Sequence, residues 1–329
     1  MAVTHNFAEQ AGINPAHVDL LTATLQAPSA HNTQAWKIRP DTDGSSYEIH
    51  FDNHPDMPAD PSLKDAYLTM GAFVETMSLQ GPNHNLAVDI NPELTREGRD
   101  LYIAHVSLSE LVEGSENDPL SQWISSRHTN RNSYSRQPLT PELSRDLEDL
   151  GNTLVDTEDL ASVVLDATME SWGDPEYIHD LKTWFRSDNN ALDGITPAPF
   201  NISKADIVAL RMAFHRGGFK SKLMQHFASD RDKKIFTSGP KAAVISVPEV
   251  APNDVFDAGR RLLRSWVTTI ASGYDYQPVS VVVDKEEPAS QVAAISGVDG
   301  VPVAVYRVGK ATKPPRGLSN RRPLDQVLI

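Results

Sequence analysis

Three polar clusters carry residue types that could bind a flat, phosphorylated ligand. Residues 28–36 (PSAHNTQAW) offer amide groups suited to the alternating donors and acceptors of a pyrimidine-like ring. Residues 127–131 (RHTNR) place two arginines around a threonine, and residues 320–323 (NRRP) contain two adjacent arginines. A guanidinium group can bind phosphate or carbonyl oxygens bidentately. If the three clusters converge, they meet the requirements of a flavin mononucleotide (FMN) pocket.

Each cluster also has an ordinary structural explanation. Residues 28–36 could form a capped loop in which Asn and Ser satisfy their own backbone, with Trp36 in the core. Arg127 follows a helical stretch expected over residues 119–126, where a cation stabilises the helix C-terminus. Arg321 and Arg322 could belong to a solvated tail. The residue types alone leave both explanations open.

The composition limits the class of protein. The chain has 329 residues, 40% hydrophobic content and no cysteine, so no disulfide or thiolate chemistry is expected. Its net charge of −14 argues against nucleic-acid binding. No apolar run reaches the roughly 18 residues of a membrane span, and the N-terminus does not resemble a signal peptide. We therefore expect a cytoplasmic protein without a nucleic-acid or membrane partner.

The elements that must position these clusters follow from hydrophobic spacing. A helix is predicted from Asn14-Pro15 up to Pro28, and a longer one over residues 64–80. Alternation predicts strands over residues 47–51, 86–90 and 101–108. The polar stretch 114–119 then marks a boundary between a first half, residues 1–115, and a second half, residues 119–329.

The second half repeats this order of elements. Helices are predicted over residues 141–154, 175–186 and 254–272, and strands over residues 162–166, 242–247 and 301–308. The two long helices each have a glycine near the start, Gly71 and Gly259, and a turn-prone residue fourteen positions later, Asn85 and Gly273. This correspondence is a faint sign of duplication.

Residues 188–222 have no counterpart in the first half. They begin as a Gly- and Pro-containing loop and continue as a basic segment predicted to be helical over residues 205–214. A long insertion of this kind can be a lid or a partner surface, or it can be a tolerated decoration. Both interpretations stay open.

Other kinds of site are not indicated. His50 and His54 lie around the end of a predicted strand and not on one helix face, so no metal site is expected. The chain has no Gly-x-Gly-x-x-Gly after a strand, no Walker-type loop and no Gly-x-Ser-x-Gly elbow.

Taken together, the clusters resemble those of the nitroreductase superfamily of FMN flavoproteins, and most closely its Acg-type branch. Residues 27–36 are similar to the family's PSxxNxQPW element, and residues 127–131 to its R-x-S-x-R element. Residues 257–263, 272–278 and 305–309 match the expected order. In this family two subunits share two FMN sites, whereas here each element occurs once and in the opposite order. The resemblance thus implies an α+β, nitroreductase-like fold, as a single-chain pseudo-dimer of two related halves with antiparallel-rich sheets flanked by helices.

The resemblance also implies roles for individual residues. Arg127, with Arg321 or Arg322, is expected to hold the phosphate with support from Thr129, and Arg131 to face the N1/O2 edge of the isoalloxazine. From the first half, Pro28, Ser29, Ala30 and Asn32 are expected to reach the ring; Gln277, Pro278, Val279, Ser280 and Val281 are expected to lie against it near N5. Two positions depart from the family pattern: Ala35 replaces a Pro, and Ser280 stands where many relatives have Glu.

Residues 1–27 contain no arginine or lysine, and residues 136–175 contain no second PSxxNxQPW element, so we expect one FMN per chain. The resemblance implies an oxidoreductase that takes hydride from NAD(P)H and reduces nitroaromatics, quinones or related small-molecule acceptors. No protein side chain is required as a catalytic acid or base, because the flavin carries the chemistry. The alternatives are a flavin-storage protein with a covered FMN, or an α+β protein without flavin. A fused pseudo-dimer is expected to be a monomer.

Overall fold

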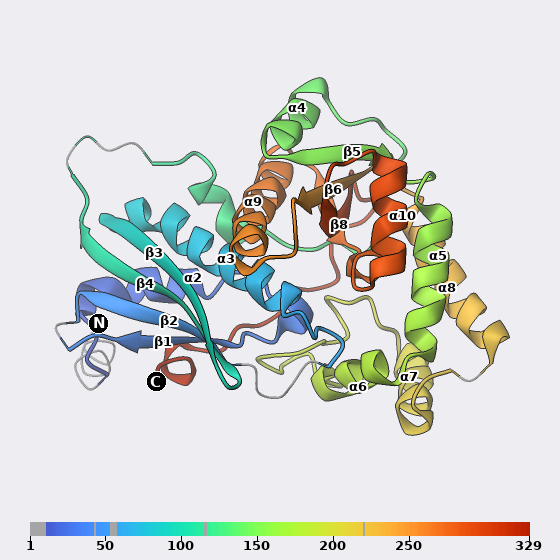
Figure 1. The fold of residues 1–329 in the computed structure, drawn as a ribbon, viewed down its shortest axis with the longest axis horizontal. Coiled ribbons are helices and arrows are strands. Elements are labelled where there is room, and N and C mark those ends of the chain that lie inside the picture. Colours follow the sequence, from blue (N-terminus) through green and yellow to red (C-terminus); the bar gives the residue numbers. More distant parts are fainter. Residues whose placement is uncertain (1–10, 43, 53–57, 113, 115–116, 220) are drawn as a thin grey trace.

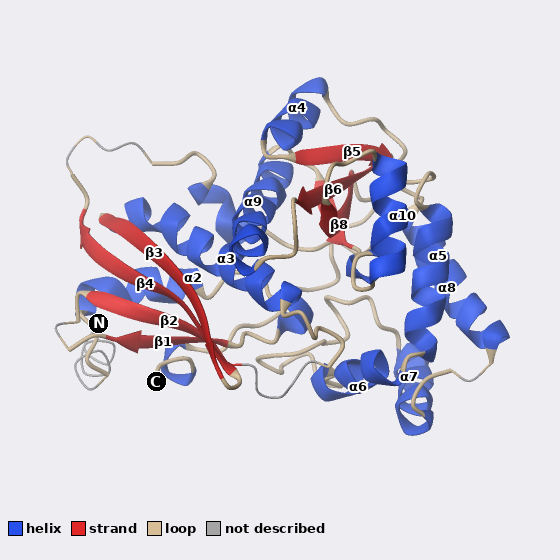
Figure 2. Ribbon diagram, viewed as in Figure 1, coloured by secondary structure: helices blue, strands red, loops and turns tan. Residues whose placement is uncertain are grey.

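Two antiparallel sheets with helices between and around them form the protein in a computed structural model, which describes residues 11–42, 44–52, 58–112, 114, 117–219 and 221–329 (Figures 1 and 2). The expected α+β class, with antiparallel sheets flanked by helices, is confirmed. Residues 1–10 and most of the polar stretch at 113–116, where the boundary between halves is predicted, lie outside the described residues.

The first half contains one sheet and one long helix. In chain order its elements are the 3-10 turn η1 (Pro15–His17), α2 (Val18–Thr24), η2 (Ala30–Asn32), β1 (Trp36–Pro40), β2 (Ser46–Asp52), α3 (Lys64–Gln80), η3 (Gly81–His84), β3 (Leu86–Glu97) and β4 (Asp100–Glu110); the 3-10 helix η4 (Ser121–Ser126) follows the predicted boundary and begins the second half. The strand order is β1-β2-β4-β3, with every neighbouring pair antiparallel.

The second half contains the other sheet and more helices. Its elements are α4 (Pro141–Asp149), β5 (Asn152–Asp156), α5 (Ala161–Gly173), α6 (Pro175–Trp184), α7 (Lys204–Arg216), α8 (Lys222–Phe236), β6 (Lys241–Val247), α9 (Pro252–Ala271), β7 (Asp275–Pro278), η5 (Ser280–Val282), α10 (Glu286–Ser296), β8 (Val301–Gly309) and η6 (Leu324–Gln326). Its strand order, β5-β6-β8-β7, matches that of the first sheet position by position.

The long helices of the two halves pack against each other at the centre of the molecule (Figure 1). A Cβ atom added to Gly71 of α3 would lie 2.0 Å from the carbonyl oxygen of Phe256, and one added to Gly259 of α9 would lie 2.3 Å from that of Leu68. Phe256 and Leu68 each come three residues before the glycine of their own helix, so the contact is reciprocal. Each helix needs its glycine because the two backbones approach too closely for any side chain.

Charge also joins the two central helices. Glu75 of α3 is almost fully buried and accepts hydrogen bonds from Arg260 Nε at 2.8 Å and Arg264 Nε at 2.5 Å, both on α9. The main hydrophobic core runs through this contact and includes residues from both sheets. The far end of the chain returns to the first sheet, where Ile38 of β1 donates to the Val327 carbonyl at 2.9 Å.

Three secondary-structure predictions need correction. Residues 162–166 are not a strand but the first turns of α5, because a short apolar run fits a buried helix face as well as a buried strand. The helix predicted over residues 141–154 ends at Asp149, since Gly151 adopts a left-handed φ of 79° and Asn152 begins β5. The helical stretch at 119–126 is the short 3-10 helix η4.

The connection between β5 and β6 is the largest difference between the halves. It holds α5, α6, α7 and α8, whereas residues 41–45 suffice between β1 and β2. The predicted insertion 188–222 lies inside this connection, and the expected helix at 205–214 is α7. No helix among the described residues is both long and apolar enough to cross a bilayer.

Candidate functional site

The loop between α2 and β1 has an unusual backbone. Three of its residues adopt left-handed φ angles: His31 (49°), Asn32 (56°) and Gln34 (51°). Two hydrogen bonds hold this shape, from Gln34 N to Ser29 Oγ at 3.1 Å and from Ala30 N to Thr69 Oγ1 of α3 at 3.4 Å. Such strained backbone persists only where the surroundings fix it, and it is concentrated at functional sites.

The second cluster is held against β7. Asn130 N donates to the Tyr276 carbonyl at 3.0 Å, and the side chains of His128 and Asn130 both bond Asp275. Arg127 is therefore not a simple helix-end cation. Its guanidinium reaches into the first half, donating to the Gln26 carbonyl at 3.1 Å and to the Tyr276 hydroxyl at 2.7 Å.

Arg321 meets Arg127 at this point. It donates to Asn32 Oδ1 at 3.0 Å and to the Ala27 carbonyl at 3.1 Å, and it reaches the same Gln26 carbonyl at 3.5 Å. The loop, Arg127 and the C-terminal arginine pair thus meet at one place, which the residue types alone left open.

The surroundings of Arg127 and Arg321 favour a bound anion. Neither Arg127 nor Arg321 forms an ion pair with a described carboxylate, and the buried Nε atom of each has no hydrogen-bond partner. Burial, and then the charge of Arg127, lower the pKa of Arg321 to about 9. Both effects oppose the charged form of Arg321, and a bound anion would relieve them. The donor set fits a phosphate.

Arg322 behaves differently from its neighbour. Its backbone N–H donates to Gln34 Oε1 at 2.8 Å, and its guanidinium pairs with Asp193 of the loop between α6 and α7. Asp193 also accepts a hydrogen bond from Arg186 Nε at 2.8 Å. Arg322 therefore shares a carboxylate with Arg186, whereas Arg321 pairs with no carboxylate among the described residues.

Arg131 faces the same loop. Its Nη1 donates to the Pro199 carbonyl at 3.1 Å, and its guanidinium lies 3.8 Å from the centroid of the Phe200 ring. Burial lowers the pKa of Arg131 to about 10, so it stays charged at neutral pH. Thr129 is half-buried and forms no hydrogen bond with a described residue.

The loop between α6 and α7 covers the place where the clusters meet. Gly194 N donates to the Asn32 carbonyl at 3.0 Å, and Gln34 Nε2 donates to the Leu192 carbonyl at 2.7 Å. Asn320 Nδ2 donates to the Ala191 carbonyl at 3.1 Å. The loop thus contacts the first and the third cluster, and through Pro199 and Phe200 it contacts the second.

The segment 277–281 lies beside the site without bonding the arginines of the clusters. Gln277 Oε1 accepts from Arg307 of β8 at 2.9 and 2.6 Å, so its side chain is committed to a buried cation. Pro278 pairs with Tyr306 within the sheet, and Ser280 is exposed. Val281 packs against a smaller group of buried apolar residues that includes Val163, Val244 and Val305.

A buried lysine fixes the end of this segment. Lys64 Nζ of α3 donates to the Val283 carbonyl at 2.5 Å and pairs with Asp284 at 3.2 Å. Asp284 and Arg131 both act on His31: burial lowers the pKa of His31, the charge of Asp284 raises it and that of Arg131 lowers it.

Sequence reasoning missed four residues of the site: Tyr276, His31, Asp193 and Arg307. Tyr276 and His31 lie inside motifs singled out above but carry no family role. Asp193 stands in the loop between α6 and α7, where only the presence of a loop could be predicted. Arg307 is fully buried and forms no ion pair with a described carboxylate. It donates to Gln277, and its Cζ lies 3.8 Å from the centroid of the Tyr134 ring. No spacing rule indicates these contacts.

Comparison with known proteins gives distant similarities. No family model matches the chain. The chain is 23% identical over 312 residues to a Serratia protein named probable NAD(P)H nitroreductase PigM, covering 86% of this chain and 85% of that protein.

Solved nitroreductases are similar over part of the chain. The FMN-dependent nitroreductase NfnB of Mycobacterium smegmatis, in complex with NADPH, is 17% identical with a TM-score of 0.39, covering 62% of this chain and 94% of that one. A nitroreductase with bound FMN from Bacteroides fragilis is 11% identical with a TM-score of 0.35, covering 60% and 90%.

Proposed function

We propose that the protein is an FMN-dependent oxidoreductase of the nitroreductase kind, which takes hydride from NAD(P)H in the cytoplasm and reduces a small-molecule acceptor such as a nitroaromatic or a quinone. One observation carries this proposal: Arg127 and Arg321 come together from distant parts of the chain, with unpartnered Nε atoms and no described counter-ion. The similarity to a protein named as a probable NAD(P)H nitroreductase supports it.

In this proposal each half contributes a different part of the site. Arg127 and Arg321 hold the phosphate, and Asn32 orients Arg321 through the 3.0 Å contact of its Oδ1. Pro28, Ser29 and Ala30 would line the flavin ring from the loop whose backbone is held in place. Arg131 would face the ring edge that becomes negative on reduction. Bound FMN would supply the hydride and electron transfer.

The duplicated framework supports a single site per chain. In the first half, residues 25–35 connect α2 to β1 and include the ring-facing loop; in the second half, only residues 150–151 connect α4 to β5. A second copy of the loop has no room there. Because the α3–α9 contact already joins two halves of like topology, we further propose that the chain acts as a monomer.

A second function is favoured by one feature, the closed loop between α6 and α7. Arg131 bonds Pro199 and stacks on Phe200, and Arg322 is paired with Asp193. If the loop stays in this position over bound FMN, nicotinamide cannot approach, and the protein stores flavin without turning it over.

The visible spectrum of the purified protein under anaerobic conditions tests both. Flavin absorption that bleaches on addition of NADPH is expected for the reductase. Absorption that persists with NADPH but bleaches with dithionite would assign the storage function. A protein that stays colourless after incubation with FMN would contradict the site itself.

A further inference from the structure

A surface with an unusual composition lies on the helices α7 and α8, at the corner of the molecule away from the first sheet (Figure 1). Five large apolar side chains are exposed there: Val208 (58%), Met212 (52%), Leu223 (76%), Met224 (49%) and Phe227 (77%). They fall within twenty residues of sequence, whereas exposed apolar side chains elsewhere are scattered. We call residues 204–219 and 221–227 the hairpin surface.

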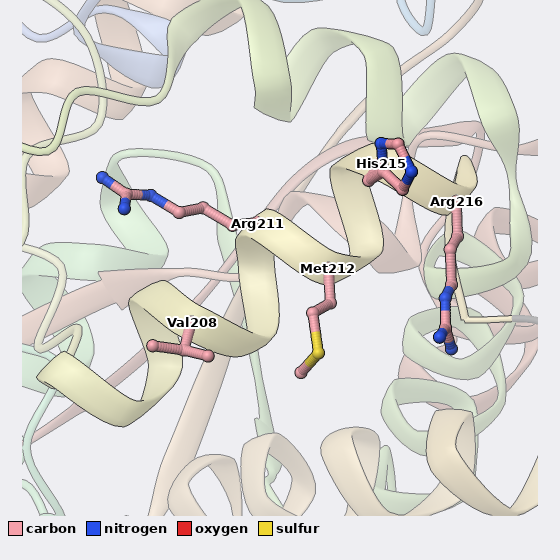
Figure 3. Close-up of a pocket in the computed structure, with 5 residues that line it drawn as sticks. All are labelled: Val208, Arg211, Met212, His215 and Arg216. Atoms are coloured by element: carbon pink, nitrogen blue, oxygen red, sulfur yellow. The ribbon is translucent and has the colours of Figure 1, made fainter.

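Cations accompany these apolar groups. Arg211, Arg216 and Lys222 are exposed, and none forms a hydrogen bond or ion pair with a described residue. Val208, Met212 and Arg216 are spaced four residues apart and follow one side of α7, beside a hollow that Arg211 and His215 also line (Figure 3). The apolar groups thus have free cations next to them.

The local charge is opposite to that of the whole protein. The hairpin surface contains four cations (Lys204, Arg211, Arg216 and Lys222) and one carboxylate, Asp206, which is paired with Arg231 at 2.9 Å. Its balance is therefore +3 in a chain of net charge −14. A partner of this surface must accept apolar side chains and also carry negative charge.

A second copy of the chain fits this surface poorly. A two-fold symmetric contact brings the same patch of both copies together, which would place Arg211, Arg216 and Lys222 against identical cations. A lipid bilayer with anionic headgroups meets both requirements, because apolar side chains enter the headgroup boundary while Lys and Arg bind the phosphates.

We propose that the hairpin surface of α7 and α8 binds peripherally to bilayers that contain anionic phospholipids. Phe227 and Leu223 enter the interface, and Arg211, Arg216 and Lys222 bind the headgroups. The proposal concerns binding at the bilayer surface and needs no membrane-spanning helix. The inference does not depend on the flavin assignment, since none of these residues contacts the clusters of the candidate site.

Vesicle flotation of the full chain tests the proposal. Vesicles of equal parts phosphatidylglycerol and phosphatidylcholine should carry the protein, and vesicles of phosphatidylcholine alone should not. The double variant Leu223→Ser/Phe227→Ser should lose most of the binding. Arg211→Gln and Arg216→Gln should each weaken it about fivefold, and added salt should weaken it further.

Two matched controls separate surface chemistry from general effects. Ile295→Ser removes a 40% exposed apolar side chain from α10, and Arg145→Gln removes an exposed cation from α4; both should leave vesicle binding unchanged. No flotation with phosphatidylglycerol vesicles, or flotation that the hairpin variants do not alter, would overturn the proposal. So would concentration-dependent self-association in sedimentation that the Leu223→Ser/Phe227→Ser variant abolishes, because it would assign the surface to a second copy.

Discussion

The two halves share a framework but differ in two connections. Both have the same strand order, and both place their long helix between the second and third strands. The first half has extra residues before its first strand, in the polar loop 28–35. The second half has extra residues after its first strand, in the connection that forms α5 to α8. A symmetric framework can therefore carry one asymmetric site. In the proposed function the first half supplies the loop that faces the flavin ring, and the second half supplies the cations and the covering loop.

The shared framework should be the most sensitive to substitution. Gly71→Ala would place a Cβ 2.0 Å from a backbone oxygen of α9, and Gly259→Ala would make the reciprocal clash. Each should lower the free energy of unfolding by about 3 kcal/mol, measured by urea denaturation.

Gly173→Ala in α5 is the control, because its Cβ would meet only the end of the Gln225 side chain, at 2.7 Å, and no backbone atom. It should lower stability much less than the two central variants, since that amide can move at the cost of one hydrogen bond to the Phe219 carbonyl. If the two central variants resembled this control, the close contact between the halves would not exist.

The next largest effects should fall on the asymmetric site. Charge-assisted hydrogen bonds contribute about 1.5–3 kcal/mol, so Arg127→Gln and Arg321→Gln should each weaken FMN binding by roughly 10- to 100-fold in a fluorescence titration. Arg136→Gln, which removes an exposed cation paired with Glu158, should have no effect.

Arg322→Gln sharpens this test, since Arg322 is already paired with Asp193. It should weaken FMN binding less than Arg321→Gln does. Equal losses from the two variants would contradict the distinction between the adjacent arginines.

The smallest effect concerns the contact between His128 and Asp275, which holds residues 127–131 against β7. The hydrogen bond to Asp275 raises the pKa of His128, against the opposing effect of burial. Although burial raises the pKa of Asp275, its hydrogen bonds from His128 and Asn130 lower it overall. The stabilisation by protonated His128 is complete below its unfolded pKa of about 6.5 and is lost as pH rises through its higher folded value.

His128→Gln should therefore lower the melting temperature more at about pH 5.5 than at about pH 8.5, with a cost of about 1 kcal/mol or less for this partly exposed pair. The same loss at both pH values would mean that the charge of His128 contributes nothing.

Secondary-structure prediction from the sequence succeeded for long periodic segments and failed for short ones. The helices α3 and α9 are confirmed nearly to the residue, since seventeen or more residues of apolar spacing leave little ambiguity. The strand prediction for residues 162–166 is wrong because its three consecutive apolar residues, 163–165, suit a helix as well as a strand. β1, β5 and β7 have four or five residues each and were not predicted, and α8 and α10 lack a clear apolar stripe in the sequence.

The residue types left open whether the three clusters meet, and only the family resemblance implied a shared site. The structure brings the loop 28–36, Arg127 and the arginine pair at 321 and 322 together, and their roles toward a cofactor stay a prediction. Neither the residue types nor the resemblance could indicate that Arg322 would pair with Asp193, because Asp193 lies more than a hundred residues away in a loop without periodicity. Contacts of this kind depend on tertiary packing, which local residue types do not encode.

The wide sequence separation within the site has a consequence for biosynthesis. Asn32 and its partner Arg321 are 289 residues apart, and the backbone N–H of Ile38 in the edge strand β1 is paired only once Val327 has been made. At roughly 5–20 residues per second, a ribosome needs about 15–60 s to make that stretch. During this interval the growing chain has an unpaired strand edge and cannot complete its two-arginine cluster, so ligand capture must follow translation.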